Sequence, residues 1–271
     1  MTGSLPHRNF ELFDSHLHII DRRFPLQSNK GYVPGPFSCE DYLGRLTDYN
    51  LVGGAVVSGS FQGFDQSYLL AALETLGSRF VGVTQLPASV SDEELIQLDA
   101  RGVRAIRFNI RRGGSESLEY LSSMAHRVFE LVGWHVELYV DCQELATLFD
   151  LLNTLPAVSI DHLGLCTDGF PQLLKLAEGG AHVKATGFGR VDLDVPQALR
   201  DLYAANPSCL MFGTDLPSTR AARPYSDSDF KLVIDVLGEI GARRVVHDNA
   251  VQFYRSGIRA GKQAHQKAGN G

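Results

Sequence analysis

The sequence predicts an α/β fold in which eight parallel strands, each followed by a helix, close into a single (β/α)8 TIM barrel over residues 1–271. Three observations predict it. Short apolar runs rich in β-branched residues recur along the chain, and a helix-like segment follows each one. Eight such units in about 250 residues match the usual size of a closed barrel. The turn after the first run, "IIDRRFPL", lacks the glycine-rich loop typical of the alternative, a doubly wound open sheet.

The expected strands are segments in which apolar and β-branched residues dominate and turn-forming residues follow. They are residues 11–20, 52–58, 80–86, 103–110, 135–141, 157–162, 181–187 and 209–214. Because helical segments separate them, the strands should run parallel.

The expected helices alternate with these strands, and two begin with clear start signals. Ser38 opens a Ser-x-x-Asp variant of the capping box, and Ser91 opens a Ser-Asp-Glu-Glu run. The expected helices are residues 38–50, 65–77, 91–101, 115–132, 143–155, 170–178, 195–205 and 227–240. The polar tail from about residue 258 to 271 is expected to fray.

Composition excludes several classes of protein. The net charge is −6 without a Lys/Arg-rich block, which argues against nucleic acid or an anionic membrane as the main partner. No apolar run approaches the roughly 20 residues that span a bilayer, and the start lacks a signal-peptide core. The cysteines, Cys39, Cys142, Cys166 and Cys209, form no CxxC and are expected to be reduced thiols. We therefore expect a cytoplasmic protein. The sequence does not indicate its oligomeric state.

The stretch "LFDSHLHIID" places His16 and His18 two residues apart in an apolar run. Side chains at i and i+2 of a strand point to the same side, so the two imidazoles should share a face. Such a pair suggests metal ligands or a catalytic pair. Because HxH is short, two hydrogen-bonded core histidines are the alternative, and the rest of the chain has to decide.

Polar residues end most of the predicted strands, at the barrel end where catalytic groups gather. In chain order they are His16, His18, Ser58, Ser60, Arg107, Asn109, Tyr139, Asp141, Asp161, His162, Thr186 and Asp215, with Arg111, Arg112 and Arg190 in the loops that follow. Residues so far apart in sequence converge only if the barrel closes, so the joint pattern is more specific than any one motif.

Taken singly, these residues also have structural interpretations. His162 could be a core or capping histidine, Asp215 a turn residue and Tyr139 a core aromatic, while Arg111 and Arg112 could be solvated. Arg107 is harder to explain in this way, because a guanidinium on an apolar strand needs an anion or several carbonyls. Several arginines with few lysines favour bidentate carboxylate binding, and therefore an anionic substrate.

These residues resemble the amidohydrolase superfamily, and specifically its amidohydrolase-2 branch, over almost the whole chain. The resemblance runs from "FDSHLHIID" through "SIDHLG" and "FGTDLP" to "DNAVQFYR". The family's HxH, later strand histidine and strand-8 aspartate match His16, His18, His162 and Asp215. Within the branch, "IRFNIRRGG", Tyr139 and "KATGFGR" resemble the 2-pyrone-4,6-dicarboxylate lactonases.

The resemblance implies a hydrolase that opens the lactone ring of a small carboxylated substrate, 2-pyrone-4,6-dicarboxylate, in aromatic-acid degradation. Asp215 would act as general base on water, and His16, His18 and His162 would polarise the lactone carbonyl. The implied substrate-binding residues are Ser58 or Ser60, Arg107, Arg111 or Arg112, Tyr139 and Arg190. The sequence does not choose between the two serines, or between Arg111 and Arg112.

The chain departs from the two-metal members of the superfamily. Arg107 and Asn109 occupy the strand that would carry their lysine or glutamate, and Tyr139 stands in place of a strand-5 histidine. A bridged two-metal site is therefore not expected. The resemblance requires no cofactor, with a single divalent ion such as zinc, held by His16, His18 and Asp215, as the open alternative.

Two other functions stay open. One is a different reaction on the same scaffold, by a mononuclear zinc hydrolase or a non-oxidative decarboxylase of another acid. The second is a non-catalytic protein that binds dicarboxylates without turning them over. Zinc content and turnover would distinguish the three.

Overall fold

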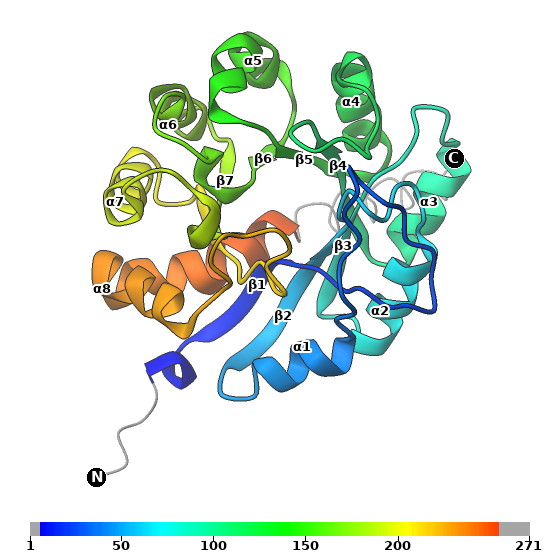
Figure 1. Cartoon of the computed structure of the whole chain (residues 1–271). Coiled ribbons are helices and arrows are strands. Elements are labelled where there is room, and N and C mark those ends of the chain that lie inside the picture. The colour runs from blue at the N-terminus through cyan, green and yellow to red at the C-terminus, as the bar shows by residue number, and fades with distance from the viewer. Residues whose placement is uncertain (1–5, 255–271) are drawn as a thin grey trace, which may run out of the picture.

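Eight parallel strands pair in chain order around the centre of the molecule, and eight α-helices surround them (Figure 1). The computed structural model describes residues 6–254, and the tail expected to fray from about residue 258 lies outside them. The strands are β1 (Glu11–Leu17), β2 (Asn50–Val57), β3 (Phe80–Thr84), β4 (Val103–Asn109), β5 (His135–Tyr139), β6 (Val158–Ile160), β7 (His182–Ala185) and β8 (Leu210–Phe212). The predicted (β/α)8 barrel is confirmed.

The helices form an outer ring, and each follows its strand. They are α1 (Cys39–Arg45), α2 (Ser67–Leu76), α3 (Asp92–Ala100), α4 (Leu121–Val132), α5 (Cys142–Thr154), α6 (Phe170–Glu178), α7 (Val195–Ala205) and α8 (Asp227–Arg243). Single 3₁₀ turns span Pro6–Asn9, Leu118–Tyr120, His162–Gly164 and Phe188–Arg190, and a π-helical turn spans Arg244–Asp248. The capping signals at Ser38 and Ser91 are used as expected, because both side chains accept the backbone N–H three residues ahead.

Each of the eight strands ends one to three residues earlier than the sequence predicts, and three of these early ends, those of β1, β6 and β7, lie at the candidate site. β1 stops at Leu17, because the backbone N–H of His18 donates to the carbonyl of Leu216 (2.8 Å). β6 stops at Ile160, because His162 adopts a left-handed conformation with φ of 51°. β7 stops at Ala185, just before the left-handed Gly187. Apolar patterning gives no signal for these local changes of backbone direction.

The first and last strands meet through the segment that follows β8. The backbone N–H of Asp215 donates to the carbonyl of His16 (2.7 Å), which places the two residues side by side. Gly213 makes this approach possible, because a Cβ there would lie 2.6 Å from the backbone nitrogen of His16.

Asp14, which the sequence did not single out, ties the same two ends together. Its carboxylate accepts the backbone N–H of Thr214 (2.8 Å), the hydroxyl of Thr214 (2.6 Å) and the hydroxyl of Tyr42 (3.1 Å). Burial raises the pKa of Asp14 to about 6, although these hydrogen bonds act in the opposite direction. Asp14 therefore fixes the position of the segment that follows β8.

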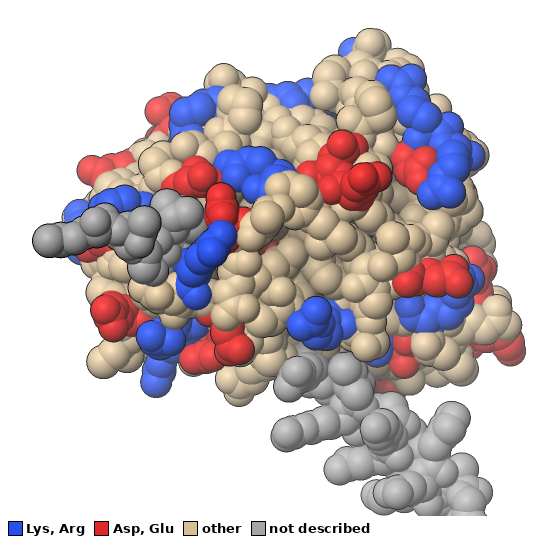
Figure 2. Space-filling model, turned by 90° about the horizontal axis from the view of Figure 1, so that it is seen from below, with Lys and Arg blue, Asp and Glu red and all other residues tan. Residues whose placement is uncertain are grey.

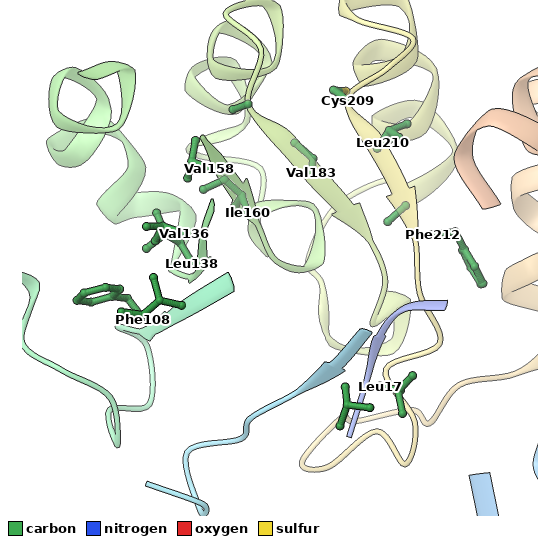
Figure 3. Packing of buried hydrophobic residues seen from close by; sticks show 14 of the residues in the cluster. Leu17, Phe108, Val136, Leu138, Val158, Ile160, Val183, Cys209, Leu210 and Phe212 are labelled. Atoms are coloured by element: carbon green, nitrogen blue, oxygen red, sulfur yellow. The ribbon is translucent and has the colours of Figure 1, made fainter. Parts of the chain in front are cut away.

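Successive residues of each strand point to opposite sides of the sheet, so their side chains pack in two different hydrophobic clusters. The outward side chains pack against the helices (Figure 3), among them Leu17, Phe108, Val136, Leu138, Val158, Ile160, Val183, Leu210 and Phe212. A smaller inward cluster comprises Phe13, Ala55, Val57, Val81, Val83, Ala105, Met211, Ala250 and Tyr254. On β4 the inward positions run from Ala105 to Arg107 and Asn109, so the barrel interior turns polar toward the carboxyl ends of the strands.

The cysteines depart from expectation at one position. Cys39 and Cys209 are free thiols, as the sequence predicts. Cys166, in the segment after β6, is disulfide-bonded, so the expectation of reduced thiols is wrong for this residue. The spacing of the cysteines along the chain did not indicate this bond.

The lengths of the helices and the distribution of surface charge bear on which large partners the protein could meet. Within residues 6–254, no helix is both long and apolar enough to cross a bilayer. Figure 2 shows basic and acidic side chains interspersed over one face, where neither sign forms a continuous surface. That face therefore offers no extended positive surface to a polyanion.

His135, at the amino-terminal end of β5, predicts how stability depends on pH. Its ring packs on Phe253 with centroids 4.2 Å apart, and burial holds its pKa well below the usual value of about 6.5. The folded state keeps His135 neutral, whereas the unfolded chain protonates it below pH 6.5. The stability it contributes is complete above that pH and is lost as the pH falls. Urea unfolding between pH 7.5 and 4.5 should show a less steep loss in His135→Gln than in the native chain, by up to about 1.4 kcal/mol per pH unit. Parallel curves would show that the imidazole is already protonated in the fold.

Candidate active site

A pocket opens at the carboxyl ends of the strands. Its lining combines histidines, arginines and one carboxylate with two aromatic rings of the loops. The lining residues are His18, Tyr32, Gly59, Ser60, Phe61, Arg107, Asn109, Arg112, Tyr139, His162, Arg190, Asp215, Thr219 and Arg220. Its four arginines make the pocket strongly basic.

His18 and Asp215 face each other across the floor of this pocket, with His16 beneath them. The Nε2 atoms of His16 and His18 lie 3.9 and 3.6 Å from Oδ1 of Asp215. All three side chains are almost fully buried. Asp215 has a φ of 58°, in the left-handed region that non-glycine residues rarely adopt. Such backbone strain is concentrated at functional sites.

The hydrogen bonds of the two histidines determine which nitrogens are protonated. Nδ1 of His18 lies 2.8 Å from the carbonyl of Val57, which can only accept, so Nδ1 carries the proton and Nε2 a lone pair. Nδ1 of His16 lies 3.5 Å from carboxylate oxygens of both Glu137 and Asp161, which favours the same tautomer. Both Nε2 lone pairs therefore point toward the Asp215 carboxylate.

Beneath the histidines lies a buried layer of charged residues from four strands. Nζ of Lys184 contacts the carboxylate of Glu137 closely and lies 3.3 Å from Nδ1 of His16. Arg107 donates to Asp161 (2.6 Å) and to the carbonyl of Ser58 (2.7 Å), and its Nε lies 3.4 Å from Glu137. Two cations thus face two carboxylates with almost no exposed surface. Burial without such pairing would be strongly unfavourable.

This layer determines the ionisation of its members. Burial raises the pKa of Glu137 above its usual value. Burial acts in the same direction on Asp161, but the Arg107 guanidinium and His16 outweigh it and hold the pKa of Asp161 well below its usual value. Burial also holds the pKa of His16 well below 6.5, so His16 is neutral near pH 7.

Arg190 forms an ion pair with Asp215 and keeps its carboxylate ionised. The guanidinium donates to Oδ2 of Asp215 through Nε (3.0 Å) and through a closer Nη2 contact. Burial alone would raise the pKa of Asp215, but the Arg190 guanidinium outweighs it and holds the pKa well below its usual value. Asp215 is therefore ionised near neutral pH. His162 is neutral there, because burial lowers its pKa to about 3.

Three described residues could hold a single metal ion. The ligand atoms of His16, His18 and Asp215 all lie within 4.8 Å of one another. Nε2 of His16 and Oδ1 of Asp215 are buried without hydrogen-bond partners, so these lone pairs lack a proton or a cation. The residues therefore fit a divalent ion. A second group, His16, Asp161 and His162, is also close together, but Arg107 and Lys184 already balance its carboxylate region.

The structure separates the substrate-binding residues expected from the sequence into two sets. Ser60, Arg107, Arg112, Tyr139 and Arg190 line the pocket together with three of the four candidate catalytic residues, namely His18, His162 and Asp215, whereas His16 lies beneath it. Ser58 does not line the pocket, because its hydroxyl is hydrogen-bonded to the hydroxyl of Tyr68 (2.6 Å). Only its backbone carbonyl contributes, by accepting a hydrogen bond from Arg107. Arg111 does not either, because its guanidinium forms an ion pair with Asp141 at the half-exposed rim.

Several residues of the site were not anticipated. Glu137 and Lys184 stand at inward positions of apolar strands, "HVELYV" and "HVKA", and a charged residue in such a run was a usable signal. Asn109 stands at the end of a predicted strand, but the sequence assigns it no role. Tyr32, Thr219 and Arg220 come from loops, where no periodicity shows which side chains point inward.

The fold and the site are those of a (β/α)8 barrel enzyme that carries histidines and an aspartate at the carboxyl ends of its strands. The family model described as amidohydrolase matches residues 13–256, and the chain belongs to the amidohydrolase family. It is therefore an enzyme.

Three relatives are informative. The chain is 26% identical to a 2-pyrone-4,6-dicarboxylate hydrolase of Comamonas testosteroni, with 89% of each chain covered. It is also 26% identical to a 4-sulfomuconolactone hydrolase of Hydrogenophaga intermedia, covering 89% of this chain and 88% of that one. A probable 2-pyrone-4,6-dicarboxylic acid hydrolase of Acinetobacter baumannii, solved with citric acid bound, shares the fold with a TM-score of 0.79 at 20% identity, covering 90% of this chain and 98% of that one.

Proposed function

We propose that this protein is a lactonase that hydrolyses a small lactone bearing two acidic groups, with 2-pyrone-4,6-dicarboxylate as its substrate. The observation that carries the proposal is the placement of an ionised Asp215 beside histidine nitrogens on the floor of a pocket lined by four arginines. The two relatives at 26% identity support it, because both are named for lactones that carry two acidic groups.

In the proposed reaction Asp215 takes a proton from a water molecule, whose oxygen forms a bond to the lactone carbonyl carbon. The carbonyl oxygen becomes an oxyanion, to which neutral His162 donates a hydrogen bond. The bond from this carbon to the ring oxygen then breaks. The ring oxygen takes the proton held by Asp215, and the carboxylate of Asp215 is regenerated. Ring closure would use the same groups in reverse.

Asp215 is a weak base while Arg190 binds it, because the guanidinium stabilises the ionised carboxylate. A substrate carboxylate that draws donors of Arg190 toward itself would weaken this pairing and make Asp215 more basic. Tyr139 and Arg107 form the adjoining wall, with the guanidinium carbon 5.5 Å from the ring centroid. Both would orient the ring of the substrate.

The three candidate metal ligands would also act in the attack of water on the lactone carbonyl. His16, His18 and Asp215 would hold a single divalent ion, which supplies a Lewis acid for the lactone carbonyl or for the attacking water. Glu137 and Asp161 would keep His16 in the ligating tautomer.

Loss of pyrone absorbance should follow when purified protein is incubated with 2-pyrone-4,6-dicarboxylate, and this measurement tests the proposal. Zinc and other divalent metals should be quantified in the same sample before and after chelation. Turnover that stops on chelation and returns with added metal assigns His16, His18 and Asp215 to an ion. Turnover by metal-free protein would show that Asp215 and the histidines act without an ion. Absence of turnover with this lactone and with 4-sulfomuconolactone would overturn the lactonase proposal.

A further inference from the structure

The four arginines of the pocket differ in whether a carboxylate already neutralises them. Arg107 is paired with Asp161, and Arg190 with Asp215. Among residues 6–254, Arg112 and Arg220 form no ion pair with any carboxylate, although both line the pocket. The pocket therefore has two positive charges for which the described residues supply no counter-ion.

Arg220 is held toward the pocket by neutral groups. Its Nη1 donates to the side-chain oxygen of Asn29 (3.0 Å), and Nη2 donates to the backbone carbonyl of the same residue. Its guanidinium carbon lies 4.2 Å from the centroid of the Tyr32 ring. Its φ of 59° lies in the left-handed region, so the loop after β8 holds it in a strained conformation. These contacts fix a cation without cancelling its charge.

Asn29 also joins Arg220 to Arg112. Its side-chain N–H donates to the carbonyl of Arg112 (3.1 Å), and the backbone N–H of Arg112 donates to the side-chain oxygen of Asn109 (3.1 Å). Segments after β1, β4 and β8 thus meet at one side of the pocket. The two guanidinium groups are near enough for repulsion, after burial, to lower the pKa of Arg220.

We propose that Arg112 and Arg220 together form an anion subsite that binds the second acidic group of the substrate, a carboxylate or a sulfonate. Two guanidinium groups that repel each other are stabilised by an anion between them, and their N–H donors suit its planar or tetrahedral oxygens. The inference rests on the proposed function for the identity of the substrate, but not for the existence of the subsite. It makes Arg220 a specificity-determining residue that selects dianions over monoanions.

The test uses ligands that cannot be hydrolysed, so binding is measured separately from turnover. Benzene-1,3-dicarboxylate places two carboxylates meta to each other, as in 2-pyrone-4,6-dicarboxylate, and benzoate lacks the second one. Calorimetric titration of the native protein should give at least a roughly tenfold lower Kd for the dianion, as one charge-assisted contact provides. In Arg220→Met this ratio should fall to within about threefold, with the Kd of benzoate unchanged. Exposed Arg200 on α7 gives the matched control, and Arg200→Met should keep the native ratio.

Further variants separate charge from packing. In Asn29→Asp a carboxylate would sit beside Arg220, so the ratio should fall although the guanidinium stays in place. The Arg112→Met and Arg220→Met effects should be less than additive in the double variant, because both residues bind one group. Replacing the dicarboxylate by 3-sulfobenzoate identifies which acid is preferred.

The proposal is overturned if the native protein binds both ligands equally, or if folded Arg220→Met keeps the native ratio. It is also overturned if that variant loses affinity for benzoate in the same proportion. Should Arg220→Met not fold, a native ratio in Asn29→Asp overturns it instead. A retained preference for dianions without any lactone turnover would leave the subsite standing and refute the lactonase.

Discussion

The Asp215→Asn variant should turn over the lactone about 10²- to 10⁴-fold more slowly than the native enzyme, while binding dianions at least as well. The amide cannot accept the proton of water, so the step that creates the nucleophile is lost. The amide oxygen can still accept from Arg190, which preserves the local geometry. Arg190 would, however, lose its negative partner, so a substrate carboxylate should bind it more tightly. We therefore expect kcat to fall while KM stays constant or decreases.

The measurement is steady-state turnover of 2-pyrone-4,6-dicarboxylate, with calorimetric binding of benzene-1,3-dicarboxylate to the same preparations. Asp235→Asn provides the matched control, because Asp235 also pairs with a cation but lies exposed on α8. Metal content must be measured in every sample, since Asp215 is also a candidate ligand. Near-native turnover in Asp215→Asn would remove Asp215 from the role of base. Reduced turnover with weaker ligand binding would indicate that Asp215 acts by shaping the pocket.

The pairing of Arg190 with Asp215 also bears on pH dependence. A carboxylate whose pKa is held well below its usual value stays ionised through the ordinary acidic range. His162, with a pKa lowered to about 3, likewise stays neutral there. The free enzyme therefore keeps both groups in the required protonation state across neutral pH.

The sequence allowed the barrel to be predicted because alternation of strands and helices is a local pattern that the fold preserves. His16 and Asp215 could be placed together for a related reason, since strand ends converge once a barrel closes. No comparable rule predicts which loop side chains line the pocket, because a loop has no regular alternation. Arg111 and Arg112 are neighbours in sequence, yet one pairs with Asp141 at the rim and the other lines the pocket. Nothing in the sequence indicated that Arg220 lines the pocket, because its position depends on the turns that follow β8.

Backbone and partner effects explain the other differences. Ser58 ends a strand as expected, but Tyr68 on α2 takes its hydroxyl, and sequence spacing does not reveal such a partner. His162 was expected inside a strand, whereas its left-handed backbone starts a 3₁₀ turn. Glu137 and Lys184 were visible as charges within apolar strands, but only their pairing across the barrel explains why burial is tolerated.

The Lys184→Met variant should be destabilised by about 3–5 kcal/mol, because removing one partner of a buried ion pair leaves the other charge uncompensated. Lys184 and Glu137 are fully buried in direct contact, and Asp161 lies in the same layer. After the substitution Arg107 alone would face two carboxylates. Methionine has a similar length, so loss of packing should contribute little compared with the loss of charge. Urea unfolding followed by far-ultraviolet circular dichroism measures the change.

Adding Glu137→Gln to Lys184→Met should recover a large part of this loss, because Arg107 and Asp161 then remain as a balanced pair. The matched control is Lys231→Met, which breaks a lysine–carboxylate pair on the exposed surface of α8 and should cost less than about 1 kcal/mol. If Lys184→Met cost no more than this control, no uncompensated charge would remain in the variant. Burial already raises the pKa of Glu137, so Glu137 would then take up a proton when the ammonium group is removed. The size of the Lys184→Met effect therefore measures how strongly the buried layer beneath His16 depends on the ion pair between Lys184 and Glu137.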